Sequence, residues 1–311
     1  MRVIFFGTSA FAVPSLERIA VHHTVIVCVT QPDRPQGRGL VPEPSPVKRA
    51  AVRLDLPLLQ PERLHASLFE ALPADVGVVA AYGQLIRTDL LQLPKWGMLG
   101  VHPSLLPKYR GAAPIAWAIL NGEITTGVTI FQLNERLDAG AWLVREPCSI
   151  EANETTEHLT ERLACQGAEA LLRAMALLDN NTAAFHAQEE SAATFAPKFT
   201  KAQGQIDWRQ SAESISRLVR ATIPWPGAAT SWKGNALKLW RVGMDAVSDA
   251  QSHTPSAAPG TVVEVNSHHI VVATGKGTVE ITEIQPAGRR RMSVREFLAG
   301  RSINIGDQLG M

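Results

Sequence analysis

The sequence predicts an α/β protein of two domains, an open sheet followed by a small β-barrel. In the first part, short apolar segments that end at Gly or Pro turns alternate with amphipathic segments, the pattern of strands joined by crossover helices. The second part breaks into strand-like segments separated by Gly, Pro and Ser clusters, as in small barrels. A length of 311 residues, 45% hydrophobic and 19% charged, suits two globular domains and excludes a mainly disordered chain.

The first part predicts its elements in order. Strands are expected at residues 3–6, 24–29 and 76–81, and helices at residues 14–20, 46–53 and 155–178. A Pro-, Gly- and Arg-rich loop fills residues 31–46. Ligands of open α/β sheets bind beyond the carboxyl ends of the strands, so the loops after residues 6, 29 and 81 are the places to look.

The domain boundaries follow from composition. Residues 1–187 are expected to form the first domain, the polar residues 188–205 a linker, and residues 206–311 the second domain. In the second domain we expect a helix at residues 211–220, strands at 237–242, 260–265, 269–273 and 278–284, and a loop at 247–259.

Several classes of protein are excluded by what the sequence lacks. No apolar run approaches the roughly 18 residues of a membrane helix, and the apolar N-terminal stretch is too short for a secretory signal, so a cytoplasmic protein is expected. The three cysteines, Cys28, Cys148 and Cys165, lack metal-ligand spacing. Their odd number argues against a disulfide framework, so we expect buried, inert thiols and no metal.

The two parts differ in charge. Residues 206–311 carry 12 Lys and Arg against 9 Asp and Glu, a net charge of +3, which leaves 18 against 20, or −2, for residues 1–205. The run Arg289, Arg290 and Arg291 is the densest basic spot. It predicts either contact with a polyanion or a solvated turn.

Nucleotide-binding motifs are missing. The turn Gly7-Thr8-Ser9 follows the first strand, but G-x-G-x-x-G is absent, so the turn predicts a cleft lining rather than an NAD site. The P-loop, H-E-x-x-H and G-x-S-x-G patterns are absent too.

The segment 100–114, GVHPSLLPKYRGAAP, differs in kind from the rest. Three prolines, two cations, a Tyr and a His within 15 residues exclude a regular helix or central strand and predict a shaped loop, the usual place of a site. His102 follows an apolar strand, and Asp138 is the candidate carboxylate downstream. A carboxylate that orients an imidazole suits a general base near neutral pH.

Ordered matches along almost the whole chain carry a family resemblance. The sequence resembles the methionyl-tRNA formyltransferases, a family of enzymes that use 10-formyltetrahydrofolate. Ser-Leu-Leu-Pro at 104–107 marks the wider folate-dependent group, and the C-terminal matches select the tRNA-modifying member. The matching segments are residues 30–39, 45–48, 80–83, 102–114, 137–140, 205–208, 220–221, 224–227, 285–288 and 291–293.

The resemblance implies a Rossmann-like catalytic domain, an OB-like barrel, and transfer of a formyl group from 10-formyltetrahydrofolate to the α-amino group of initiator methionyl-tRNA. By position, His102 would be the catalytic imidazole and Asp138 its partner. No metal would take part, and a monomer is expected. Folate would contact Tyr82, Gly83, Gln84, Leu85, Ser104, Leu105, Leu106, Pro107, Ala139 and Gly140, and tRNA would contact Arg34, Arg38, Lys48, Arg289, Arg290 and Arg291.

The sequence departs from the family at two places. The family pattern is Asn-x-His, but Gly100 precedes His102 by two residues and offers no side-chain amide to the developing oxyanion, so Asn at this position is expected to raise turnover. Residues 40–43, Leu-Val-Pro-Glu, replace lysines. Two alternatives follow: a formyltransferase for another amine such as an amino sugar nucleotide, and a catalytically impaired folate- or tRNA-binding homologue.

Overall fold

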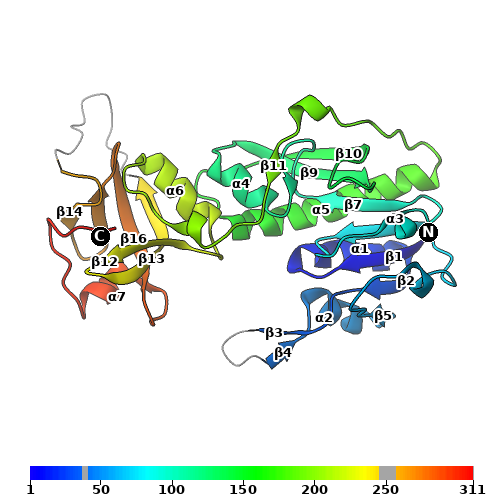
Figure 1. The fold of residues 1–311 in the computed structure, drawn as a ribbon, viewed down its shortest axis with the longest axis horizontal. Coiled ribbons are helices and arrows are strands. Elements are labelled where there is room, and N and C mark those ends of the chain that lie inside the picture. Colours follow the sequence, from blue (N-terminus) through cyan, green and yellow to red (C-terminus); the bar gives the residue numbers. More distant parts are fainter. Residues whose placement is uncertain (37–40, 245–256, 311) are drawn as a thin grey trace. The chain divides into compact units, whose positions relative to one another are not determined.

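The structure, a computed structural model, describes residues 1–36, 41–244 and 257–310 (Figure 1). These residues fall into two compact units. The first comprises residues 1–114, 125–149 and 159–197, and the second comprises residues 115–124, 150–158 and 198–311.

A seven-stranded sheet organises the first unit, in the order β10-β9-β7-β6-β1-β2-β5. The five strands from β7 to β5 are parallel, and β9 and β10 add an antiparallel edge. Two short ribbons, β3 with β4 and β8 with β11, complete the unit. The strands are β1 (Arg2–Gly7), β2 (Thr24–Val29), β3 (Arg34–Gln36), β4 (Val41–Glu43), β5 (Leu58–Leu59), β6 (Val76–Ala80), β7 (Met98–His102), β8 (Arg110–Gly111), β9 (Thr125–Gln132), β10 (Trp142–Ser149) and β11 (Phe195–Ala196).

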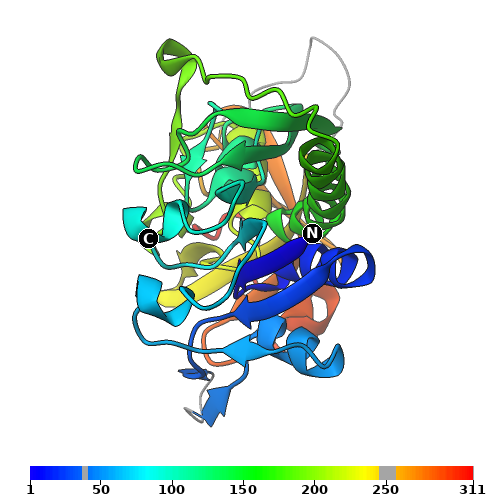
Figure 2. The same ribbon diagram turned by 90° about the vertical axis from the view of Figure 1, so that its right-hand side faces the viewer.

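Helices α1 (Val13–His22) and α5 (Thr156–Asp179) lie on one face of this sheet (Figures 1 and 2). An ion pair between Arg18 and Glu169 joins them. Gly167 of α5 lies so close to β7 that an added Cβ would be 2.9 Å from Val101 Cγ1. Since alternate strand residues face opposite ways, Gly100 and His102 of β7 face away from α5. The other helices of the chain are α2 (Pro46–Arg53), α3 (Thr88–Leu91), α4 (Pro114–Leu120), α6 (Ala212–Ala221) and α7 (Val294–Leu298).

The second unit contains an antiparallel sheet in the order β12-β13-β16-β15-β14, with β17 paired to β16. The C-terminal residues 306–310 join its two edges, because Val262 N–H donates to the Asp307 carbonyl at 2.8 Å and Gly310 N–H to the Ser231 carbonyl at 2.9 Å. The sheet therefore closes as a small barrel, as the sequence predicts. Its strands are β12 (Ala228–Trp232), β13 (Asn235–Met244), β14 (Val262–Val265), β15 (Ile270–Ala273), β16 (Thr278–Pro286) and β17 (Met292–Ser293).

Two expectations need correction. Residues 100–102 belong to the central strand β7, so the shaped loop begins only at Pro103. Cys28 is buried, but Cys148 is partly exposed and Cys165 is exposed, so the three free thiols are not all in the core. The predicted α/β sheet is confirmed, and strands β9 and β10 add an antiparallel edge to its parallel strands. The loop predicted at residues 247–259 lies largely outside the described residues.

No described helix combines the length and the hydrophobicity that a membrane span requires.

Candidate active site

His102 ends strand β7 and is buried, with 6% of its surface exposed. Its Nε2 lies 2.9 Å from the carbonyl oxygen of Tyr109. A carbonyl oxygen can only accept, so Nε2 carries the hydrogen, and in the neutral ring Nδ1 keeps the lone pair. Nδ1 lies 3.7 Å from Asp138 Oδ2. The ring is therefore held in the tautomer that can take a proton next to a carboxylate.

Asp138 lies in the connection between β9 and β10, in the left-handed backbone region with φ +50°. Its Oδ2 accepts a hydrogen bond of 2.8 Å from the backbone N–H of Gly111, 27 residues away. A carboxylate that only capped its own turn would bond to neighbouring N–H groups instead. The structure thus brings together the His102 and Asp138 side chains that the sequence analysis paired.

The loop at residues 104–107 is held rigidly. Ser104 is fully buried, and its hydroxyl donates to the Lys108 carbonyl at 2.6 Å. Thr129 Oγ1 donates to the Ser104 carbonyl at 2.7 Å and accepts from Leu106 N–H at 3.0 Å. Leu106 is fully buried as well, so of the four predicted folate residues here only Leu105 and Pro107 retain side-chain surface.

The predicted folate residues after β6 divide between core and surface. The Tyr82 side chain is 1% exposed and packs in the core, where burial raises its pKa to about 12. Its main-chain carbonyl instead faces the loops after β1 and β2, where it accepts hydrogen bonds from the Thr8 hydroxyl and the Gln31 side-chain amide. Gly83 is exposed, with φ +82°. Leu85 is 77% exposed.

Gln84 and Leu85 line a hollow of about 260 Å³ together with Arg63, His65 and Arg87. A second hollow, of about 440 Å³, is lined by residues 94–97 and 132–135 among others. Neither is lined by His102, Asp138, Ala139 or Gly140, and the last two are buried. The structure thus leaves the predicted folate residues in separate groups.

Gly100 allows close packing beside His102. A Cβ added here would lie 2.4 Å from Phe131 Cε1 and 2.8 Å from Leu133 Cδ1. Phe131 is 4% exposed and meets the His102 ring edge-on, with the centroids 6.4 Å apart. The space that an Asn side chain would need at position 100 is therefore occupied by an aromatic ring.

The candidate tRNA residues of the first unit are not equivalent. Arg34 is exposed on β3, opposite Glu43 of β4. Lys48 is tied to Asp33 at 2.6 Å, and this hydrogen bond lowers the pKa of the Asp33 carboxyl. Arg38 lies outside the described residues.

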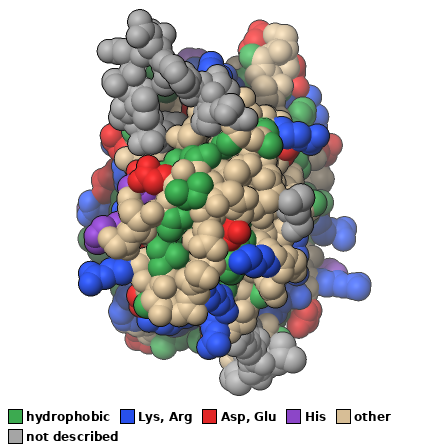
Figure 3. Space-filling model, turned by 90° about the vertical axis from the view of Figure 1, so that its left-hand side faces the viewer, with side chains coloured by type: hydrophobic (Ala, Val, Ile, Leu, Met, Phe, Trp, Pro, Cys, Tyr) green, Lys and Arg blue, Asp and Glu red, His purple; other side chains and the backbone are tan. Residues whose placement is uncertain are grey.

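The arginine run lies on the turn between β16 and β17. Arg290 pairs with Glu296 at 2.7 Å, and Arg291 pairs with Glu283 and lies over the Trp240 ring. Arg289 is exposed, and its carbonyl accepts from Gln285. On the face shown in Figure 3, Lys and Arg side chains are scattered rather than gathered in one block.

The described residues contain no group of three or more His, Cys, Asp and Glu side chains arranged to hold a metal ion.

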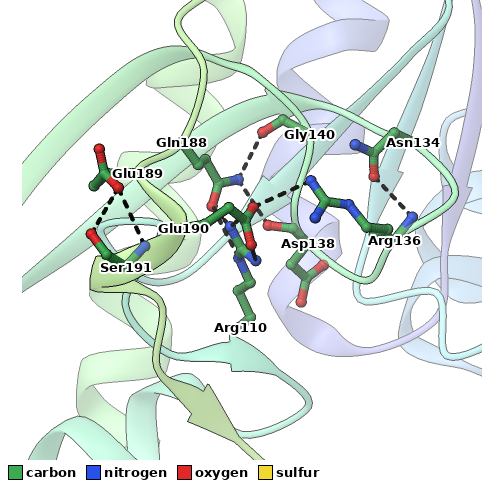
Figure 4. A network of polar contacts seen from close by, with 9 residues as sticks. All are labelled: Arg110, Asn134, Arg136, Asp138, Gly140, Gln188, Glu189, Glu190 and Ser191. Carbon is green, nitrogen blue, oxygen red and sulfur yellow. Dashed lines mark hydrogen bonds and ion pairs between the residues drawn. The ribbon is translucent and has the colours of Figure 1, made fainter.

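Sequence reasoning missed three residues around this pair. Phe131 packs on His102, and Arg110 and Gln188 form the polar network in Figure 4. Arg110 lies in the unusual segment 100–114, so the composition of that segment could have indicated it. Nothing in the sequence marks Gln188, because its partners are distant along the chain.

A buried imidazole beside a partly buried carboxylate, at the end of a strand of a mixed α/β sheet, is an arrangement that can accept and donate a proton. Two family models match the chain: formyl transferase over residues 1–175, and formyl transferase, C-terminal domain, over residues 198–302. The chain belongs to the formyl transferase family.

Curated relatives match the chain from end to end. One is the methionyl-tRNA formyltransferase of Alkaliphilus oremlandii, 42% identical over 100% of both chains. Another is the methionyl-tRNA formyltransferase of Chromobacterium violaceum, 41% identical over 100% of both chains.

Solved structures share the fold at low identity. The N-formyltransferase from Helicobacter canadensis, in complex with folinic acid and dTDP-3-aminofucose, is 15% identical with a TM-score of 0.69, over 93% of this chain and 99% of that one. HypX from Aquifex aeolicus, in complex with tetrahydrofolic acid, is 17% identical with a TM-score of 0.63, over 98% of this chain and 50% of that one.

Proposed function

We propose that the protein transfers a formyl group from 10-formyltetrahydrofolate to the α-amino group of methionine on initiator methionyl-tRNA. The observation that carries this proposal is the match, over 100% of the chain at about 40% identity, to relatives named for this activity. The barrel unit supports it, because the C-terminal family model covers residues 198–302.

The chemistry assigns His102 the proton transfers. As the amine nitrogen bonds to the formyl carbon, the C=O electron pair moves to oxygen and an N–H proton moves to Nδ1 of His102. The electron pair on the oxygen then re-forms the C=O bond as the C–N bond to the folate breaks, and the departing folate nitrogen takes the proton from Nδ1. Asp138 Oδ2, 3.7 Å from Nδ1, stabilises the imidazolium formed between the two steps.

The residues present suit the folate co-substrate. The hollow beside Gln84 and Leu85 carries Arg63 and Arg87, cations that match the carboxylates of a glutamate tail. Leu85, an exposed apolar side chain on that hollow, suits the face of a pterin ring. Arg34, Arg38, Lys48 and the run Arg289 to Arg291 remain the proposed tRNA contacts.

The test is formylation of methionyl-tRNA with 10-formyltetrahydrofolate, in the wild type, in His102→Ala, and in His22→Ala as an exposed histidine control. We expect formyl-methionyl-tRNA from the wild type and the control, and none from folded His102→Ala. Formylation of a dTDP-amino sugar in preference to methionyl-tRNA would support the amino-sugar alternative instead. Binding of both substrates without product would support the impaired homologue. Size-exclusion chromatography with light scattering tests the expected monomer.

A further inference from the structure

The Asp138 backbone needs an external support. Residues 134–137 before it are exposed, and Asp138 itself adopts φ +50°, in the left-handed region that Asp tolerates better than most residues but that still costs energy relative to extended or helical backbone. Its carboxylate must nevertheless stay within a few ångströms of His102 Nδ1. Some contact outside the loop therefore sets where this carboxylate lies.

Gln188 makes that contact. Its amide Nε2 donates to the carbonyl oxygens of Asp138 at 2.8 Å and of Gly140 at 2.7 Å (Figure 4). One side chain therefore joins the carbonyl groups on either side of residue 139. An amide nitrogen has two hydrogens, and both are used here. The loop carbonyls are therefore fixed relative to the Gln188 amide plane.

Arg110 orients the Gln188 amide by donating to its oxygen. The Arg110 side chain is 4% exposed, and its Nε and Nη2 donate to Gln188 Oε1 at 3.1 and 2.9 Å (Figure 4). Its outer nitrogens donate to Glu190 at 3.1 and 3.0 Å, which pairs the buried charge and lowers the pKa of the Glu190 carboxyl. Because the guanidinium fork can only donate, Gln188 must turn its oxygen toward Arg110 and its NH₂ toward the loop.

The segment that contains Gln188, residues 188–196, also holds the group that binds the Asp138 carboxylate. Strand β11 pairs with β8 in the register Arg110 with Phe195 and Gly111 with Ala196. Gly111 N–H is the donor to Asp138 Oδ2. Residues 188–196 thus hold both the backbone of Asp138, through Gln188, and the N–H group that binds its carboxylate, through β11.

We propose that Gln188 is a positioning residue that sets the Asp138 carboxylate against His102, with Arg110 orienting it. This inference rests on the catalytic pair assigned under the proposed function. The Gln188 side chain is bonded to Arg110 and to the two loop carbonyls, so its loss is expected to act on the catalytic step through Asp138 and to leave the affinity for both substrates nearly unchanged.

The test replaces Gln188 by Met, which keeps the length of the side chain and removes both bonds to the loop. A misplacement of about 1 Å can cost roughly 10²-fold in rate, so we expect kcat to fall about 10- to 100-fold with both KM values within about threefold. Gly111 N–H should exchange faster with solvent in this variant, because its acceptor moves. Glu189→Gln is the matched control: Glu189 bonds to Ser191 in the same segment, and kcat should stay near wild type.

A double-mutant cycle separates positioning from general damage. If Gln188 acts through Asp138, Gln188→Met should cost little in an Asp138→Asn background. Equal losses in both backgrounds, or full activity of Gln188→Met, would overturn the inference. If Gln188→Met does not fold, Gln188→Glu keeps the acceptor for Arg110 and places an oxygen against the two carbonyls, and it should lose at least as much activity. Wild-type kcat in Asp138→Asn would instead refute the catalytic pair itself.

Discussion

Gly100→Ala perturbs the contact between strand β7 and the Phe131 ring by a single methyl group. The added Cβ would lie 2.4 Å from Phe131 Cε1 and 2.8 Å from Leu133 Cδ1, whereas ordinary contacts begin at 3.4 Å. The ring must therefore retreat by 3.4 − 2.4 = 1.0 Å. Phe131 is 4% exposed and packs edge-on against His102, so it has little room to move away.

Overpacking of this kind costs about 1–3 kcal/mol. A cost of about 2 kcal/mol lowers the melting temperature of a domain of this size by roughly 4–8 °C. Calorimetry of Gly100→Ala measures the shift. Gly300→Ala is the control, because a Cβ there meets no atom within 4 Å and the effect should be small.

Phe131→Leu removes the ring atoms that a Cβ at position 100 would meet. We therefore expect Gly100→Ala to cost at least about 1 kcal/mol less in the Phe131→Leu background than in the wild type. For the same reason, Gly100→Asn alone should lower turnover rather than raise it, and only with a smaller residue at position 131 can an amide be seated beside His102. An unchanged melting temperature in Gly100→Ala, or equal costs in both backgrounds, would refute this reasoning.

Three further predictions concern charged residues. Asp138→Asn should lower kcat by at least about 10²-fold while the KM for tRNA changes little, since the carboxylate acts on the imidazole; steady-state kinetics measures both. Arg289→Ala should raise the KM for tRNA and flatten its salt dependence more than Arg290→Ala, because Arg290 already pairs with a glutamate. Asp33→Asn should lower the melting temperature at neutral pH. The pKa of Asp33 is lowered by Lys48, so its stabilising contribution is present above about pH 4 and lost as the pH falls through the lowered value, and the difference from wild type should vanish there.

Local patterns predicted most elements of the fold. The strand at residues 24–29 and the helix at residues 46–53 begin and end as expected, because each is bounded by residues whose backbone preference is decisive, such as Pro46 at the first turn of α2. Residues 100–102 were harder to predict. Their Gly and His are poor strand formers, and they belong to β7 only because β6 and β9 pair on both sides.

The sequence predicted that His102 and Asp138 lie together, and the structure places their side chains 3.7 Å apart, while their catalytic role stays a prediction. His102 and Asp138 could be paired in the sequence, since an imidazole and a carboxylate have complementary roles. Gln188 could not be found in this way, because its proposed role depends on two main-chain carbonyls about 50 residues earlier, and every residue has a carbonyl. The residues that fix a site's geometry are therefore less visible in a sequence than those that perform its chemistry.

The hydrogen bonds of residues 104–111 also indicate which group could stabilise the negative charge that develops on the formyl oxygen. Main-chain N–H groups are the usual donors when no side-chain amide is present. Here Ser104 N–H donates to the His102 carbonyl, Leu106 N–H to Thr129, and Gly111 N–H to Asp138. These three donors are already engaged within the protein. Under the proposed function, the His102 imidazole would gain an N–H donor beside the reacting atoms once it has taken the amine proton on Nδ1. We propose that this single side chain both accepts the proton and stabilises the oxyanion, so that the reaction needs the imidazole at position 102 but not an amide at position 100.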